Sequence, residues 1–199
     1  MEEKLTKELA KKIMATKGEA RGITIKSDWE VILKEKGQAA LKKLEAKMAE
    51  LGYPLKYREI KTMDFYPIGL DAISTLAIKE VFGLTDKEAE EIGAKAVKFS
   101  LFLKIIMKYF FSPRLLVKEA PKMWRKHYTV GDLAVSKFNQ KERYAVITLK
   151  NLAIHPSFCT ALKGYFARIV QMTVGMPAVC QETKCVFRGD SYHQFLIKW

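Results

Sequence analysis

The sequence contains few cysteines, and their number excludes a scaffold held together by disulfides. Only Cys159, Cys180 and Cys185 occur among the 199 residues, and an odd number leaves at least one thiol unpaired. A chain of this length buries enough apolar surface to fold without covalent cross-links. We therefore expect free thiols and a reducing compartment such as the cytoplasm.

The sequence also lacks an apolar run long enough to span a bilayer. Its most apolar window, residues 97–111, is interrupted by Lys98, Lys104 and Lys108. This window falls short of the roughly 20 residues that a membrane-spanning helix needs. The chain opens with charged residues rather than with the charged-then-apolar pattern of a secretion signal. Both observations agree with a cytoplasmic protein.

Motifs of common enzyme classes are absent. The sequence has no G-x-S-x-G nucleophile elbow, no glycine loop that cradles phosphate and no H-E-x-x-H zinc motif. Cys159 and His155 stand four residues apart, but no third group that could orient such a pair is identifiable. The sequence therefore favours a binding protein over an enzyme, and it favours a core or surface role for Cys159.

The charge is strongly positive, at +13, but it is not concentrated. Lysines are spread along the chain with glutamates between them, and there is no arginine-rich run or zinc-finger spacing. Nucleic acid is therefore not the expected partner. Two interpretations stay open, a lysine-rich solvated surface and peripheral contact with an anionic membrane.

The first two thirds of the sequence have the apolar spacing of helices. Two capping boxes, Ser27 with Glu30 and Thr85 with Glu88, predict helix starts. Gly37 weakens the helix that follows Ser27 and indicates a break within it. The expected helices span residues 2–16, 27–51, 70–82, 85–111 and 114–127.

The period of the pattern changes in the last third. Residues 114–127 are expected to form one or two short helices, bent or interrupted by Pro121. After residue 127, β-branched and aromatic residues dominate. We expect a hairpin, a helix and a second hairpin there. The predicted fold is α+β, with N-terminal helices packed on an antiparallel sheet built from two hairpins joined by a crossing helix. Residues 1–20 are expected to be a helical extension and 21–199 a single domain. The predicted strands span 129–137, 144–149, 178–187 and 191–199, and the crossing helix spans 156–174.

The segment 99–111 is the most promising lining for a binding site. It is rich in phenylalanine and leucine and also carries Met107, so a helix there is buried on most sides. It is either a core helix or the wall of an apolar cavity, which would measure several hundred Å³ for a drug-sized ligand. With a filled core, the chain is instead an interaction or scaffold protein that dimerises through helical faces. The predicted ligand-binding residues are Phe99, Phe102, Leu103, Ile106, Phe110, Trp124, Phe166 and Ile169.

Two further candidates involve histidine. Cys180, Cys185 and His193 carry the thiolate and imidazole groups that zinc prefers. The register of the last hairpin decides whether Cys185 and His193 share a face, and a regular strand places Cys180 and Cys185 on opposite faces. His127, at the end of a predicted helix, is the candidate axial ligand of a haem.

The final segment resembles a known family. Cys180-x4-Cys185, a turn with Gly189 and the strand His193–Ile197 resemble the C-terminal signature of the 4-vinyl-reductase-like domain family. That family ends in a strand of the form Cys-x-Phe-x-aliphatic, and His193 stands at the position of its cysteine. Over residues 21–199, the order of elements is also similar to haem–nitric-oxide-binding domains and to subunits of the TRAPP vesicle-tethering complex.

This resemblance implies a sensory or regulatory domain that binds a small hydrophobic molecule such as a tetrapyrrole or an acyl chain. The Tyr-x-Ser-x-Arg motif with which the haem-binding relatives hold porphyrin propionates is absent from this sequence. A haem-binding gas sensor therefore stays an alternative. An enzyme that reduces a tetrapyrrole vinyl group would need a partner to supply electrons.

Overall fold

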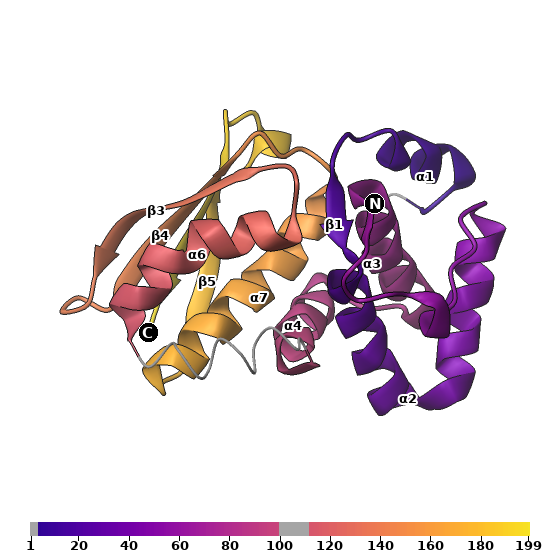
Figure 1. Cartoon of the computed structure of the whole chain (residues 1–199), viewed down its shortest axis with the longest axis horizontal. Coiled ribbons are helices and arrows are strands. Elements are labelled where there is room, and N and C mark those ends of the chain that lie inside the picture. The colour runs from indigo at the N-terminus through magenta and orange to yellow at the C-terminus, as the bar shows by residue number, and fades with distance from the viewer. Residues whose placement is uncertain (1–3, 100–111) are drawn as a thin grey trace.

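Two layers make up the molecule: a four-stranded antiparallel sheet with helices on one face, and a group of N-terminal helices beside it (Figure 1). The computed structural model describes residues 4–99 and 112–199. This arrangement is the predicted α+β fold. The helices are α1 (Lys7–Met14), α2 (Gly22–Glu50), α3 (Ile68–Phe82), α4 (Asp86–Ala96), α6 (Pro113–His127) and α7 (Pro156–Val174), with 3-10 turns η1 (Tyr57–Glu59), η2 (Val97–Phe99) and η3 (Val186–Arg188). The strands are β1 (Glu19–Arg21), β2 (Phe65–Pro67), β3 (Asp132–Asn139), β4 (Tyr144–Lys150), β5 (Val179–Lys184) and β6 (His193–Lys198).

The large sheet consists of the two predicted hairpins, joined edge to edge. Its strand order is β3-β4-β6-β5, and every neighbouring pair is antiparallel. The crossing helix α7 has the predicted bounds, because Pro156 occupies its first turn and Gly175 ends it in the left-handed conformation. Residues 145–149 of β4 are all buried, and alternate residues of β6, including Phe195 and Ile197, are buried beneath the helices.

The start of α2 differs from the prediction. The helix begins at Gly22, so Ser27 lies in its second turn and does not cap it. The segment just before it forms β1, which pairs with β2 in a small second sheet that the sequence pattern did not reveal. Gly37 does break the helix, as expected, because its φ of 79° and ψ of −178° are accessible essentially only to glycine.

The helices around the second capping box follow the prediction more closely. Both hydrogen bonds of the box are present, from Glu88 N to the Thr85 side chain and from Thr85 N to the Glu88 side chain. Gly83 ends α3 in the left-handed conformation. The predicted helix 85–111 is described only to the 3-10 turn at Phe99, and the remainder lies outside the described residues.

A single helix, α6, covers the stretch for which one or two helices were expected. Pro121 lies within it and removes one backbone hydrogen-bond donor without dividing it. The apolar side of α6, which includes Leu116 and Trp124, lies over the sheet next to β3 (Figure 1). This helix therefore covers the part of the sheet that α7 leaves open.

The N-terminal helix α1 packs against α3. Leu5, Leu9 and Ile13 belong to the buried core, and the Leu5 amide donates to the Glu80 carboxylate at 2.8 Å. The division into an extension and a single domain stays a prediction.

Within residues 4–99 and 112–199, no helix has both the length and the apolar character required to traverse a membrane.

Candidate functional site

A cavity of about 150 Å³ lies between the helices and the inner face of the large sheet. Its walls come from α2, α3, α4, α6, α7 and strands β3, β4 and β6. Most of the surface is apolar, which is typical of small-molecule sites. The apolar lining residues include Ile23, Leu116, Val117, Leu133, Val135, Ala145, Ile147, Phe158, Leu162 and Val170.

Three of the eight predicted ligand-binding residues line this cavity: Trp124 from α6, and Phe166 and Ile169 from α7. Phe99 is half-buried but is not on the lining, and its ring lies beneath the Lys34 ammonium, 4.1 Å from the ring centroid. The four other predicted residues lie outside the described residues. They are Phe102, Leu103, Ile106 and Phe110.

The volume of the cavity differs from the several hundred Å³ expected for a drug-sized ligand. An apolar cavity of about 150 Å³ accommodates a molecule the size of benzene. The bulky side chains of Trp124, Phe158 and Phe166 reduce the free space among the described residues. The geometry therefore fits a small aromatic or aliphatic compound better than a tetrapyrrole or a long acyl chain.

Two aspartates interrupt the apolar lining, and neither was among the binding residues predicted from the sequence. Asp71 of α3 is only 3% exposed, and Asp28 of α2 also lines the cavity. Burial raises the pKa of Asp71 to about 7 and, together with the neighbouring Asp71, raises the pKa of Asp28 well above its usual value. The signal was available, because Asp71 is the single charge within a stretch, residues 68–78, that is otherwise apolar or uncharged.

His127 lies on the cavity lining at the C-terminal end of α6. Burial, reinforced by the positive charges of Arg21 and Lys126, lowers the pKa of this imidazole to about 4. The ring is therefore neutral at physiological pH, which is the form that ligates metals. Its assignment as a haem ligand stays a prediction.

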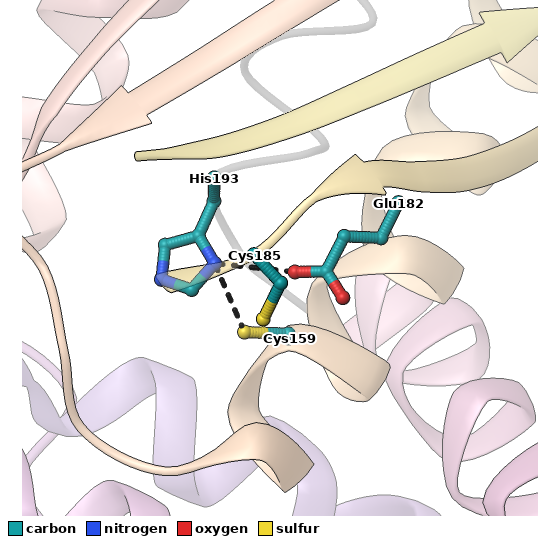
Figure 2. Close-up of side chains that lie close together, drawn as sticks. All are labelled: Cys159, Glu182, Cys185 and His193. Carbon is teal, nitrogen blue, oxygen red and sulfur yellow. Dashed lines mark hydrogen bonds and ion pairs between the residues drawn. The ribbon is translucent and has the colours of Figure 1, made fainter. Parts of the chain in front are cut away.

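A second candidate site lies where α7 meets the last hairpin. The side chains of Cys159, Glu182, Cys185 and His193 point toward one another (Figure 2), and one ligand atom of each lies within 4.8 Å of all the others. The Cys159 sulfur and the His193 Nδ1 are 3.5 Å apart, and the same Nδ1 is 3.1 Å from Glu182 Oε1. Two thiols, an imidazole and a carboxylate are a typical donor set for zinc.

The 3.5 Å separation fits a tetrahedral metal centre, and the 3.1 Å separation is slightly shorter than such a centre requires. Zinc–ligand bonds of 2.0–2.3 Å place adjacent ligand atoms roughly 3.3–3.8 Å apart. On its other side, the imidazole Nε2 of His193 lies 3.0 Å from the buried carbonyl oxygen of Leu152, to which it donates. A neutral imidazole then has only a lone pair at Nδ1, and this lone pair faces the acceptor oxygen of Glu182. Either a cation or a second proton must lie between these two acceptors, and the donor set of the cluster fits zinc as that cation.

The local structure explains why these four residues converge. Cys159 lies in the first turn of α7, and His193 shares the inner face of β6 with Phe195. A bulge between Glu182 and Lys184 adds one residue to β5 and changes the alternation. Cys185 therefore lies beside His193, on the same face as Glu182.

Cys180 is the one predicted metal ligand that lies outside this group. It pairs with Ile197 in the sheet, whereas Glu182 pairs with Phe195, so Cys180 is two residues, roughly 7 Å, farther along the strand. Because of the bulge, Cys180 shares a face with Cys185 and is not on the opposite face expected of a regular strand, but it lies about four strand positions, roughly 13 Å, away from Cys185. Cys159 and Glu182 complete the set instead.

Sequence spacing alone did not reveal Cys159 as a member of this cluster. His155, which stands four residues before Cys159, caps α7, where its Nδ1 accepts from Ser157 N at 3.2 Å. Burial and the nearby Glu182 carboxylate raise the pKa of the Cys159 thiol. Metal binding at this cluster would therefore release protons.

Searches with the sequence find no matching model of a protein family and no matching curated protein. The fold, in contrast, is similar to solved H-NOX structures. An H-NOX protein from S. oneidensis in the Fe(II)NO ligation state has a TM-score of 0.66 and 10% identity, over 89% of this chain and 98% of that chain. An unliganded Fe(II) H-NOX protein from K. algicida has a TM-score of 0.55 and 11% identity, over 89% and 95% of the chains. The fold group implied by the sequence resemblance is thus confirmed.

Proposed function

We propose that this chain is a sensory or regulatory domain that binds a small apolar molecule in the cavity between its helices and the large sheet. The observation that carries this proposal is the cavity itself, with its mainly apolar lining. The resemblance of residues 180–197 to the 4-vinyl-reductase-like domain family supports it. Fold similarity to H-NOX proteins is compatible with it but does not establish a function.

The size of the cavity limits the ligand class. About 150 Å³ accommodates roughly six to eight heavy atoms, which corresponds to a substituted benzene or a short branched hydrocarbon. Among the lining residues that the structure describes there is no lysine or arginine. The two propionates of a haem would find no cationic partner among these described lining residues, so the small apolar ligand is the better match.

We also propose that Cys159, Glu182, Cys185 and His193 hold a structural zinc ion. Four protein ligands leave no open position for substrate, which distinguishes structural from catalytic zinc. Zinc, when bound, supplies a cross-link between α7 and the last hairpin. Because α7 also contributes Phe158, Leu162 and Phe166 to the cavity, this cross-link would hold one wall of the ligand site.

Binding of toluene, followed by isothermal titration calorimetry, tests the proposed ligand site. Ala145 of β4 is buried and lines the cavity, so Ala145→Met fills part of it. Ala134 of the neighbouring strand β3 is exposed and does not line the cavity, which makes Ala134→Met the matched control. We expect the parent and Ala134→Met to bind toluene and Ala145→Met to lose at least tenfold in affinity.

Two results would contradict this proposal. One is the absence of binding by toluene and by other compounds of its size. The other is equal affinity of the two methionine variants, since binding would then occur outside the cavity. Native mass spectrometry of the purified protein adds an independent measurement, because a retained small molecule increases the mass of the intact chain.

A further inference from the structure

The polar groups of the cavity are gathered at one end. Thr24, Ser27 and Asp28 come from α2, and Asp71 and Thr75 come from the adjacent helix α3. Tyr128 also lines the cavity, and burial together with the nearby Asp71 and Asp28 raises the pKa of its hydroxyl well above the usual value. The side chains that α7 and the sheet add to the lining are apolar except for Tyr165, and α6 adds apolar side chains and His127. The cavity therefore has one polar end and one apolar end.

This polar end carries two acidic groups and no counter-charge from the described residues. Among the described residues, no lysine or arginine lines the cavity. Within the same residues, neither Asp28 nor Asp71 forms an ion pair. The guanidinium of Arg21, which lies nearby in β1, donates to the carbonyls of Lys126 and Met63 instead. Buried carboxylates without a cation are unfavourable.

Ser27 is an independent indication that a ligand belongs at this end. It lines the cavity and is 6% exposed, yet its hydroxyl has no hydrogen-bond partner within residues 4–99 and 112–199. Its position inside α2, and not at the helix start, removes the capping hydrogen bond that the sequence predicted. Buried polar groups of folded proteins are nearly always satisfied, and an exception points to an absent partner.

Aromatic rings surround the same end. The Trp124 and Tyr128 rings stack with centroids 4.2 Å apart, and Phe158 meets Tyr128 edge-on at 6.1 Å. Trp124 is fixed in place because its indole N–H donates to the Val130 carbonyl at 3.0 Å. Aromatic faces attract cations and repel anions, with the largest effect where water is excluded.

From these observations we infer that the cavity binds a small primary amine, with its ammonium group at the polar end and its hydrocarbon part at the apolar end. Asp28 and Asp71 accept hydrogen bonds from the ammonium group, and the hydroxyl of Ser27 is a further acceptor beside them. The ring of Tyr128 faces the same cation. This inference rests on the proposed function, since it specifies the ligand class of the same cavity.

The titration behaviour of the two aspartates agrees with this assignment. Without a ligand, burial raises the pKa of Asp71 against the lowering effect of a hydrogen bond from Thr24, and burial together with the Asp71 charge raises the pKa of Asp28, so that the pair retains a proton near neutral pH. An ammonium group supplies the positive charge that this proton otherwise provides. A carboxylate or phosphate at the same place would add to the repulsion.

Three ligands of nearly equal shape separate the possibilities: benzylamine, benzyl alcohol and toluene. We expect calorimetry at pH 7.5 to show benzylamine binding at least tenfold more tightly than benzyl alcohol. Asp28→Asn and Asp71→Asn keep the shape of the lining but remove the charge, and each should reduce this preference to less than threefold. Asp64→Asn, at an exposed aspartate away from the cavity, is the matched control and should keep the full preference.

Toluene distinguishes failure of this inference from failure of the proposed function. If toluene binds while benzylamine binds no better than benzyl alcohol, the amine assignment is wrong and the apolar site stands. If Asp28→Asn and Asp71→Asn bind benzylamine as tightly as the parent, the polar end is not the ammonium site. If none of the three compounds binds, both proposals fail. Thermal unfolding of each variant confirms that it is folded.

Discussion

Gly164 of α7 packs directly against the backbone of Glu90 in α4. A Cβ atom at Gly164 would lie 1.8 Å from the Glu90 carbonyl oxygen, and one at Gly93 of α4 would lie 2.4 Å from the Ala161 carbonyl oxygen of α7. The two helices thus contact each other through backbone atoms at two successive places. Because Gly93 and Ala161 also line the cavity, this close approach sets the position of one of its walls.

Gly164→Ala should therefore be strongly destabilising. No rotamer change can relieve a contact with backbone, so the helices must separate, and overpacking of this kind costs about 3 kcal/mol of unfolding free energy. Urea unfolding measures the loss. Lys163→Ala, the control, removes the neighbouring 2.8 Å ion pair with Glu90 and adds no atoms, so its cost should stay below about 1 kcal/mol. Equal effects of the two substitutions would refute the steric explanation.

The parts of the fold that the sequence predicted well are those fixed by local chemistry. The bounds of α7 follow from Pro156 and Gly175, and the start of α4 follows from the capping box of Thr85 and Glu88. The start of α2 could not be predicted in this way. Pairing of β1 with β2, from residues more than 40 positions apart, ends the extended segment at Arg21 and lets the helix begin before Ser27.

The candidate sites were only partly predictable, because they too depend on contacts between segments that are far apart in the sequence. Cys185 and His193 belong to one hairpin, so their proximity followed from a choice between two registers. Cys159 joins them only because α7 crosses the sheet, and Glu182 only because β5 contains a bulge. Similarly, Asp28 and Asp71 face each other across the contact between α2 and α3, which no spacing within either helix reveals.

Zinc binding should require the residues of the cluster, and loss of the zinc should destabilise the protein. We expect the purified protein to contain about one zinc ion per chain, measured by elemental mass spectrometry. Cys159→Ser and Cys185→Ser should each lose most of the metal and lower the melting temperature. A strong chelator should have a similar effect on the parent, because metal binding to the folded state adds to the folding free energy.

Cys180→Ser provides the control for the metal prediction. Cys180 is also a buried cysteine of the same hairpin, but it lies outside the cluster. Its substitution should leave the zinc content unchanged and cost only the small penalty of a buried hydroxyl. Equal loss of zinc from all three serine variants would indicate an unspecific effect on folding, and a metal-free parent would contradict the site itself.

Titration with haemin distinguishes a haem sensor from a domain that binds a small apolar ligand. Because the cavity is small and its polar lining is acidic, we expect no sharp Soret band whose position depends on His127. His127→Ala should behave like the parent in this titration. A Soret band in the parent that disappears in His127→Ala would favour the haem sensor over the small apolar ligand.

The stability of the ligand-free protein should fall as the pH rises from about 4 to 7. In the unfolded chain Asp71 has an ordinary pKa near 4, whereas burial raises its pKa to about 7 in the folded protein. Between these values the folded state binds more protons than the unfolded state, so the free energy of unfolding decreases with increasing pH, in total by on the order of 4 kcal/mol from this group. The loss is absent below about pH 4 and complete above about pH 7.

Asp71→Asn removes the titrating group while preserving its shape. The free energy of unfolding of this variant should therefore decrease much less between pH 4 and 7 than that of the parent. Urea unfolding at pH 4.5, 5.5 and 7 of the variant and the parent measures the contribution of Asp71 together with its effect on Asp28, whose pKa the Asp71 charge helps to raise. More distant titrating groups, including His127 and the cluster thiols, are common to both proteins. Asp64→Asn, at the surface, should retain the decrease. A parent and an Asp71→Asn variant with parallel profiles would mean that the Asp71 carboxyl is ionised in the folded protein, and this prediction would then be wrong.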